Sequence, residues 1–445
     1  MSSGKPNLFA RIMKFASQIE ENEIKTVLAS FSFVFVLMSA YYMLRPVRDA
    51  MASNWSDSEV SWLWTSTFFF SVIAVAIYGF VISRIRFENL VPGVYGFFAS
   101  TFVLFYLGTR VVTDSDVIDK AFYVWVSVFS LYHISVFWSF MADVFNSKQA
   151  ARLFGFITTG ASVGGIVGPL IPTLFASKLG NENLMLLATV LLVLTIPVIM
   201  WIQKLKIADL HNQDVHADPS KQATIGGNPF SGFVDFVKNP YLLGLGVFIL
   251  LYTGIGSFIY FELKNLMAVI EDPNMRSQYW SGINLSVNIV AIVTAMFATG
   301  RIASRFGLAV TLAMVPFVLV IGLLLVAVSP MLWVVMLMQV VLKGGNYAIT
   351  RPGREMLFTE VDRETRFKSK PVIDIVVYRG GDMVWAWGFT ALTEGIGLGL
   401  GAVAAVGAGI AAVWTAAGVY LGRWYNRHAE QGSTAAVQPD AVPSS

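Results

Sequence analysis

The sequence predicts an all-α membrane protein in which twelve transmembrane helices form two pseudo-symmetric six-helix halves. Of its 445 residues, 56% are hydrophobic and only 13% are charged, whereas soluble domains carry about 25% charged residues. Apolar stretches of about 20 residues, enough to cross a hydrocarbon layer about 30 Å thick, recur along the whole chain. A polar segment over 204–240 divides these stretches into six and six.

The twelve predicted spans follow one another in order along the chain. The first continues to Ala52, because no turn signal follows Leu44. The spans cover 26–44, 60–82, 90–108, 121–141, 154–176, 184–202, 241–261, 280–300, 308–328, 331–349, 371–392 and 398–421.

These spans divide the chain into five segments. We expect a cytoplasmic amphipathic segment over 1–24, a six-helix half over 25–203, a cytoplasmic linker over 204–240, a second half over 241–422 and a disordered cytoplasmic tail over 423–445. Arg11 and Lys14 interrupt the apolar positions of the first segment, which indicates an interfacial helix, so we expect no leader to be removed. In the linker, Phe230, Phe233, Val234 and Val237 have helical spacing and predict a short helix on the membrane surface.

The distribution of Lys and Arg predicts the orientation of the chain in the membrane, and a short internal repeat predicts the symmetry of its two halves. Lys and Arg gather in the loops on the side of the two chain ends, which predicts cytoplasmic termini in a bacterial inner membrane. Gly79–Arg84 and Gly300–Arg305 both read Gly-x-x-x-Ser-Arg, are 221 residues apart and end equivalent spans. A parallel repeat of two halves explains this spacing. Chance recurrence at cytoplasmic helix ends remains the alternative.

The first span carries three charged residues at its outer end. A charge in the hydrocarbon core costs about 2.5 to 3.5 kcal/mol on insertion scales, so such residues require water or partners. We interpret them as one cationic face of a hydrated cavity, with Asp49 one turn from Arg45. The alternative is a helix that ends near Leu44, with arginines reaching the headgroups. The residues of this face are Tyr41, Arg45, Arg48, Asp49 and Ala52.

Span 10 repeats this pattern. Lys343 is about thirteen residues into the span, hence about 18 Å deep, and must line water or an anion path. The alternative is a structural partner for Asp374 or Glu262. Arg351 and Arg354 are explained equally well by the orientation of the chain. The residues expected on this face are Lys343, Tyr347, Thr350, Arg351 and Arg354, with Asn346 beside them.

Two further spans carry acidic groups. Glu262 in span 7 is expected to face the basic residues of span 1 and to carry a coupling proton or hold an arginine, unless it is an outer-rim carboxylate. Asp374, Tyr378 and Asp382 in span 11 have helical spacing, with Arg379 on a neighbouring face. They belong to a substrate site or to a structural network.

Several function classes find no support in the sequence. Span 5 carries Gly160, Gly164, Gly165 and Gly168, which favour close helix packing because no Lys follows them as in a phosphate loop. There is no cysteine, no catalytic triad and no metal motif, and the four histidines are scattered. A net charge of +3 is too small to indicate nucleic acid. We therefore expect no enzyme, no cofactor, no metal and no nucleic-acid partner.

Two motifs carry a resemblance to a known family. The segment Tyr42–Asp49 resembles the Leu-Arg-Pro-Leu-Lys-Asp segment in the first span of ATP/ADP translocases, the nucleotide transporters of plastids and intracellular bacteria. Tyr347–Phe358, continuing to Lys370–Asp374, is similar to that family's Tyr-Ser-Leu-Phe-Asp-Pro-Thr-Lys-Glu-Met-Ala-Tyr, which is followed by a Lys and Val-Asp-Val. Phe137–Phe140 and Glu262 fit less specifically. The resemblance implies a major facilitator fold and nucleotide exchange, with Arg48, Glu262 and Lys343 at the family's functional positions.

The chain also departs from the family pattern. Asn346 stands where the family has a second lysine, Arg351 replaces the aspartate before proline, and the glutamate expected early in span 4 falls near Val126. Because phosphate recognition depends on cationic side chains in a low-dielectric cavity, these changes could shift the specificity to another anion.

We therefore expect a monomeric secondary transporter in the lipid bilayer that exchanges a small anion, ATP/ADP or phosphate, by alternating access. Arg45, Arg48 and Lys343 would bind the anion, Glu262 and Asp49 would position these cations or couple counter-transport, and Tyr41 or Tyr347 would stack on a base. Two alternatives remain open. One is a proton-coupled exporter of an amphiphilic compound or another organic anion that uses Glu262 or Asp143, and the other is a membrane receptor that does not transport.

Overall fold

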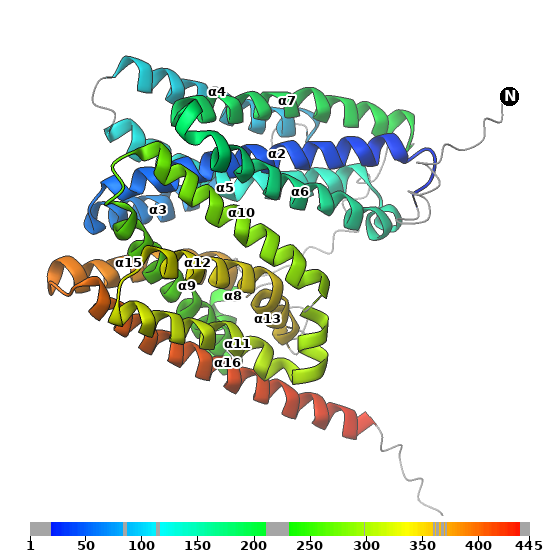
Figure 1. Ribbon diagram of the computed structural model, residues 1–445. Coiled ribbons are helices and arrows are strands. Elements are labelled where there is room, and N and C mark those ends of the chain that lie inside the picture. The colour runs from blue at the N-terminus through cyan, green and yellow to red at the C-terminus, as the bar shows by residue number, and fades with distance from the viewer. Residues whose placement is uncertain are drawn as a thin grey trace, which may run out of the picture. The chain divides into compact units, whose positions relative to one another are not determined.

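The computed structural model describes residues 19–82, 87–112, 116–210, 231–297, 299–358, 361, 365, 369 and 372–436. Within them every regular element is a helix, as the composition predicts (Figure 1). The amphipathic segment expected over 1–18, most of the linker and the pair Ser83 and Arg84 of the repeat lie outside the described residues.

The helices form two compact units. Unit 1 consists of Met1–Trp55, Thr65–Ala223 and Ile270–Leu285, and unit 2 of Ser56–Trp64, Thr224–Val269 and Ser286–Ser445. Each unit therefore takes a short segment from the other half of the sequence. These two segments are the first turns of equivalent helices, α3 and α10, in the two halves of the repeat.

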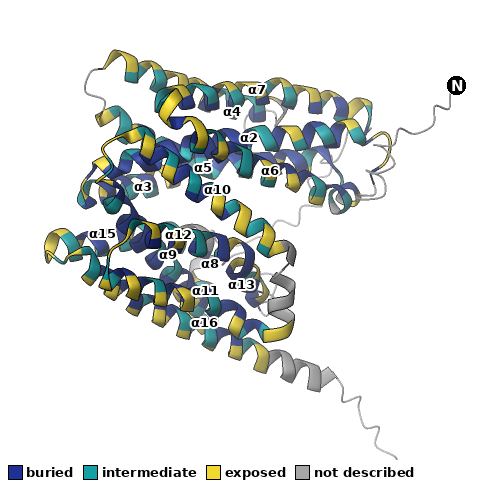
Figure 2. Ribbon diagram, viewed as in Figure 1, coloured by how far each residue is buried: buried dark blue, intermediate teal, exposed yellow. Residues whose placement is uncertain are grey.

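In unit 1 the central element is α2, which packs against α5, α6 and α7. In unit 2, α9 packs against α12, α15 and α16, and α11 packs along α16. Figure 2 shows that α2 and α9 bury most of their length. The elements of the first half are α2 (Ile24–Met51), η1 (Ala52–Asn54), α3 (Asp57–Ile82), α4 (Phe87–Val111), α5 (Asp116–Val144), α6 (Ser147–Leu179) and α7 (Asn181–Ala208).

The second half is less regular than the first. Three of its elements, η3, η5 and η6, are π-helical. Its elements are α8 (Ser231–Lys238), α9 (Pro240–Met267), α10 (Pro273–Phe297), α11 (Thr299–Val328), α12 (Leu332–Gly345), η3 (Asn346–Thr350), α13 (Arg351–Leu357), η5 (Val372–Val377), α15 (Tyr378–Thr390), η6 (Ala391–Gly395) and α16 (Leu400–Ala436).

The order of these helices is consistent with the twelve predicted spans. Nine segments of the described chain are long and apolar enough to cross a membrane. The other three predicted spans correspond to α3, to α10 and to α15 with its flanking π-helical turns. The short helix predicted in the linker is confirmed as α8.

Local sequence signals set several helix boundaries. The side chain of Asn146 accepts from the backbone N–H of Gln149, whose own side chain accepts from the Asn146 N–H, and this capping box begins α6. Gly180 takes a φ of 79° between α6 and α7, a conformation that glycine adopts without steric cost. Asn239 caps α9, and Pro240 supplies its first residue.

Glycines bring α6 close to α2, as predicted for span 5. A Cβ atom at Gly160 would lie 2.6 Å from the carbonyl oxygen of Phe31, and one at Gly168 would lie 2.7 Å from that of Ser39. Any larger residue would therefore push the two backbones apart. The packing interpretation of these glycines is confirmed.

One helix end differs from the expectation. The last helix, α16, continues to Ala436, whereas we expected a disordered tail from residue 423. The added segment is rich in residues that favour helix, including Ala, Arg, Glu and Gln, and contains no proline. The hydropathy signal ends where the apolar residues end, although the backbone hydrogen bonding continues.

Candidate functional site

The basic face of span 1 lies on an unbroken helix. α2 runs through Pro46 to Met51, so the alternative in which the helix ends near Leu44 is wrong. The side chains of Arg45 and Arg48 are only 14% and 13% exposed, and that of Asp49 is 1% exposed. These charges therefore lie inside unit 1 and not on its surface.

Arg48 bridges two helices. Its Nε and Nη2 atoms donate to Oδ1 of Asp49 at 3.0 and 2.5 Å, and its Nη1 donates to the hydroxyl of Ser127 on α5 at 3.0 Å. Its guanidinium also lies 5.1 Å from the ring centre of Tyr123. Because the guanidinium is planar, these contacts fix both its position and its orientation.

Arg45 adds a second cation to the same carboxylate. Its Nε lies 3.8 Å from Oδ2 of Asp49. The sequence placed Asp49 beside Arg45, and the structure shows that Arg48 is the closer partner. Two arginines against one aspartate leave this cluster with one net positive charge, which is the property that an anion site requires.

Aromatic rings lie on the same helices. The ring of Tyr41 stacks on that of His133, with centres 4.2 Å apart and planes inclined by 24°. Phe129 lies 6.4 Å from the Tyr41 ring. We call Tyr41, Arg45, Arg48, Asp49, Ser127 and His133 the α2–α5 cluster.

A second cluster with the same balance of charge lies in unit 2. The carboxyl group of Asp382 on α15 interacts electrostatically with Arg379 and with Lys343 of α12. Lys343 therefore has an acidic neighbour that the sequence analysis did not assign to it. Among the described side chains, two cations and one carboxylate again sum to one net positive charge.

Tyrosines accompany these charges. The rings of Tyr252 on α9 and Tyr378 on α15 have their centres 6.0 Å apart, and Tyr347 interacts electrostatically with both. We call Tyr252, Lys343, Tyr347, Tyr378, Arg379 and Asp382 the α12–α15 cluster. It draws residues from α9, from α12 and the adjoining turn η3, and from α15.

The single face predicted for span 10 is wrong. The π-helical turn η3 follows α12 directly and changes the register of every residue after it. Thr350 is 2% exposed and Tyr347 is 39% exposed, while Arg351 is exposed. Arg354 is partly buried and pairs with Glu355 at 3.1 Å. Of the predicted residues, Lys343 and Tyr347 therefore enter the cluster.

Span 11 departs from regular helix for the same reason. Asp374 lies within the π-helical turn η5 and Tyr378 begins α15, so the two residues are not joined by the continuous α-helix on which the predicted four-residue spacing depends. The side chain of Asp374 lies outside the described residues. Asn346, which replaces a family lysine, is half-buried at the junction of α12 and η3.

Glu262 lies apart from the α12–α15 cluster. It is ten residues after Tyr252 on α9, a rise of about 15 Å. Its side chain is buried, and neither carboxyl oxygen has a hydrogen-bond partner among the described residues. A charged carboxylate in this position would be costly. Asp143, the other acid that we considered for coupling, pairs with Lys206 at 2.9 Å.

Several residues of both clusters were missed by sequence reasoning. Ser127 and Tyr252 have no signal of their own in apolar spans, and His133 was set aside as a scattered histidine. Ser127 follows Val126, the position where the family's glutamate was expected, and its hydroxyl contacts Arg48. Among the described residues no three acidic or histidine side chains are grouped so as to hold a metal ion.

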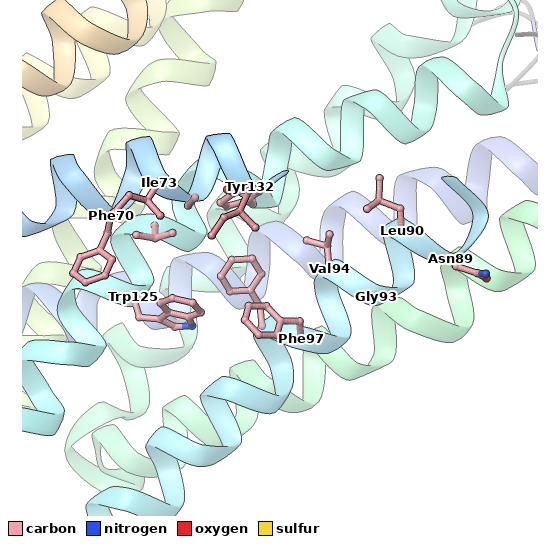
Figure 3. A pocket seen from close by; sticks show the side chains of 13 residues that line it. Phe70, Ile73, Asn89, Leu90, Gly93, Val94, Phe97, Trp125 and Tyr132 are labelled. Carbon is pink, nitrogen blue, oxygen red and sulfur yellow. The ribbon is translucent and has the colours of Figure 1, made fainter. Parts of the chain in front are cut away.

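A cavity in unit 1 has different chemistry. It has a volume of about 560 Å³ and lies among α3, α4 and α5. Figure 3 shows the side chains that line it. Apolar residues such as Phe70, Ile73 and Phe97 form its walls, Asn89 lies at one end, and no charged residue lines it. An anion would lose its hydration there without gaining a partner, so we exclude this cavity from the anion site.

Comparison with known proteins agrees with this architecture. The profile described as Major Facilitator Superfamily matches residues 29–359. The chain is 21% identical to ADP,ATP carrier protein 1 of Chlamydia pneumoniae in an alignment of 519 positions that covers 100% of both chains. It is 22% identical to ADP,ATP carrier protein 1 of Chlamydia muridarum, covering 84% of this chain and 83% of the relative.

Solved structures of transporters share the fold. The nucleoside transporter NupG superposes with a TM-score of 0.63 at 14% identity, covering 90% of this chain and 99% of that one. A bacterial homologue of the iron transporter ferroportin, in its inward-facing state, gives a TM-score of 0.61 at 9% identity over 91% of this chain and 100% of that one. The chain belongs to the Major Facilitator Superfamily and is a multi-pass membrane transporter, not an enzyme.

Proposed function

We propose that this transporter exchanges ATP and ADP, or closely similar phosphorylated anions, across the bacterial inner membrane, with both chain ends cytoplasmic. The observation that supports it is the shared composition of the two clusters. Arg45, Arg48 and Asp49 in one unit, and Lys343, Arg379 and Asp382 in the other, each combine two cations with one carboxylate.

The chemistry of the clusters suits a nucleotide. Guanidinium and ammonium groups hold phosphate oxygens through charge-assisted hydrogen bonds, which are about twice as strong as neutral ones. Tyr41 with His133, and Tyr347 with Tyr252, add aromatic surfaces for a base. The similarity of this chain to relatives named ADP,ATP carriers supports a substrate of the same class.

A transport cycle follows from the family mechanism. In alternating access, one half of the protein moves against the other around a site near the bilayer midplane. Asp49 and Asp382 would hold the cations in place while the site is empty, and the phosphates would compete for them on binding. The net positive charge of each cluster would then attract an anion to the empty protein.

Counterflow in proteoliposomes tests the proposal. Vesicles containing the wild-type protein and unlabelled ADP should accumulate labelled ATP, with phosphate and nucleosides compared in parallel. Arg48→Ala and Lys343→Ala each remove a charged contact worth about 1.5 to 3 kcal/mol, so we expect uptake to fall by about 10- to 100-fold.

The matched control is Arg110→Ala, which removes a cation from the half-exposed pair with Glu182. It should leave uptake unchanged, because exposed pairs contribute about 0 to 1 kcal/mol. Wild-type uptake in both Arg48→Ala and Lys343→Ala would remove these residues from the binding site. Uptake of none of the phosphorylated anions would refute the exchange function.

Glu262 favours a second candidate, a proton-coupled exporter of an amphiphilic compound or another organic anion. A buried carboxyl group without a hydrogen-bond partner among the residues that the structure describes is a suitable carrier for a proton. Transport that requires a pH gradient and no counter-substrate, and that is lost in Glu262→Gln, would select this candidate. Stabilisation of the protein by ATP without any flux would instead indicate a receptor.

A further inference from the structure

We propose that Asp57, Lys264 and Glu394 form a latch that holds the first turns of α3 in unit 2, and that transport requires this latch to open. They are positioning residues for the transport cycle and lie outside both clusters. The inference rests on membership of the transporter family and does not depend on which anion is carried.

Asp57 is the centre of the latch. Its Oδ1 accepts from Nζ of Lys264 at 2.7 Å and from Nδ2 of Asn265 at 3.1 Å, while its Oδ2 accepts from the hydroxyl of Thr393 at 2.8 Å. The side chains of Lys264 and Asp57 are 1% and 7% exposed. One carboxylate thus ties α3 to the end of α9 and to the π-helical turn η6.

Glu394 holds the same helix by its N-terminus. Its Oε1 accepts from the backbone N–H groups of Asp57 at 2.7 Å and Ser58 at 3.1 Å, and its Oε2 accepts from the Ser58 hydroxyl. These N–H groups have no partner within α3, and a carboxylate beside them also interacts favourably with the helix dipole. Because Glu394 belongs to η6, this cap fixes the position of α3 against η6 as well as stabilising the first turn of α3.

Side-chain packing continues along the next turns. The hydroxyl of Ser61 lies 2.8 Å from that of Thr390. The ring centre of Trp62 lies 5.2 Å from that of Trp387, and the ring centre of Trp64 lies 5.3 Å from that of Tyr260. Every one of these contacts lies inside unit 2. From Thr65 onward, α3 belongs to unit 1.

A helix shared by two units must respond when the units move. It can bend at the boundary, or its first turns can leave unit 2. Sharp bends occur almost always at proline, at Gly/Ser pairs or at π-bulges. From Asp57 to Tyr78, α3 contains neither proline nor glycine, so it has no built-in hinge near Thr65. Release of the latch is therefore the mode of movement that this helix allows.

The equivalent helix of the repeat provides a contrast. The first turns of α10 belong to unit 1, where Arg276 donates to the side chain of Asn54 and to the carbonyl of Ile270. α10 contains the pair Ser281–Gly282 just before it passes into unit 2 at Ser286. It has a bend site where α3 has none. The buried ion pair of Asp57 and Lys264 is therefore on α3, the helix whose first turns must separate from unit 2.

The absence of cysteine from the sequence makes the test clean. Ser61→Cys places one thiol at a position that is completely buried in unit 2. We would measure its rate of reaction with N-ethylmaleimide in the purified full-length protein. With Asp57→Asn added, Lys264 loses its charged partner, and we expect the rate to rise at least tenfold.

A charge-compensated double variant distinguishes the loss of the Asp57–Lys264 ion pair from a general destabilisation of the protein. Asp57→Asn combined with Lys264→Gln keeps a hydrogen bond without leaving a buried charge, so the labelling rate should return to within threefold of the parent. Glu182→Gln breaks an exposed pair on another part of the chain and should change nothing. Ser56→Cys, an exposed position, should react rapidly in every background.

Two results would overturn the proposal. One is an unchanged Ser61→Cys rate in Asp57→Asn, and the other is equally fast labelling in the charge-compensated double variant. If Asp57→Asn does not fold, Glu394→Gln replaces it, with an expected rise of at least threefold, and an unchanged rate there is equally decisive. The assay contains no substrate, so its failure is distinct from failure of nucleotide exchange.

Discussion

The two basic stripes look alike in the sequence but lie on different backbones. From Tyr41 to Asp49 the stripe follows an unbroken α-helix, and its three charged side chains meet as the spacing predicts. From Lys343 to Arg354 the same spacing crosses the π-helical turn η3, and the residues separate. Identical spacing therefore predicts one face only where the α-helix persists.

Both stripes contain elements that can disturb a helix, and proline is not the deciding one. Pro46 lies inside α2 without breaking it, whereas the turn η3 directly follows Gly344 and Gly345. A Cβ at Gly345 would lie 2.7 Å from the side chain of Val315 on α11. Close approach to α11 therefore requires glycine here. π-helical turns often lie at functional sites, and in this chain one adjoins Lys343.

A one-residue deletion gives the strongest test of this comparison. Removing Ala40 from α2 rotates one side of the helix by about 100° relative to the other, so we expect no folded protein. Removing Ala348 from η3 converts a π-helical turn to α-helix and leaves the flanking helices in place. That variant should elute as a single species and unfold within about 5 °C of wild type. Equal damage from both deletions would contradict the assignment of η3.

The two aspartates should differ in their effect on stability. Asp49→Asn leaves two largely buried arginines without their carboxylate, and breaking a buried pair costs about 3 to 5 kcal/mol. Asp382→Asn should cost less, because Asp382 is only half-buried. Thermal unfolding in detergent measures both, and Arg45→Gln added to Asp49→Asn should recover part of the loss. A larger effect at Asp382 would reverse the proposed order.

Exchanging arginine and lysine tests the same difference between the two clusters. Arg48 contacts Asp49 and Ser127 through separate nitrogens, and a lysine has one nitrogen with which to reach them. Arg48→Lys should therefore lower transport about tenfold, which corresponds to about 1.4 kcal/mol. Lys343→Arg keeps the charge and should stay within threefold of wild type. Initial uptake rates decide between these outcomes, and equal loss in both variants would show that charge alone matters.

The smallest effect is expected at the apolar cavity of unit 1. Gly93 lines it, and a Cβ there meets no atom within 4 Å. Gly93→Leu should fill part of the space and leave transport within twofold of wild type, as should Gly155→Leu, where there is also room. Loss of transport in Gly93→Leu alone would bring this cavity into the transport path.

Much of the fold could be predicted because its signals are local. Long apolar stretches predict the spans, and the Asn and Gly residues at 146, 180 and 239 set helix ends through their own backbone and side-chain chemistry. The glycine spacing of span 5 predicted close packing, which α2 and α6 show. The all-helical membrane fold therefore followed from composition and periodicity, and the described helices are consistent with the twelve predicted spans.

The candidate site was only partly predictable. Charged residues in apolar spans are conspicuous, so Arg45, Arg48, Asp49 and Lys343 could be selected. Their partners Ser127, His133 and Tyr252 could not, because a serine, histidine or tyrosine within a span has several common explanations. Lys264 and Asp57 were missed for another reason: they are 207 residues apart and meet only through folding.

The sequence by itself determined that this protein is a helical membrane protein with charged residues inside its spans, because hydrophobic length and the cost of charge in a bilayer act on each segment separately. The tertiary structure alone decided which charges meet, where the helices turn into π-helix, and that α3 and α10 each start in one unit and end in the other. Those features depend on packing between segments that are distant along the chain, and no local pattern of residues encodes such packing.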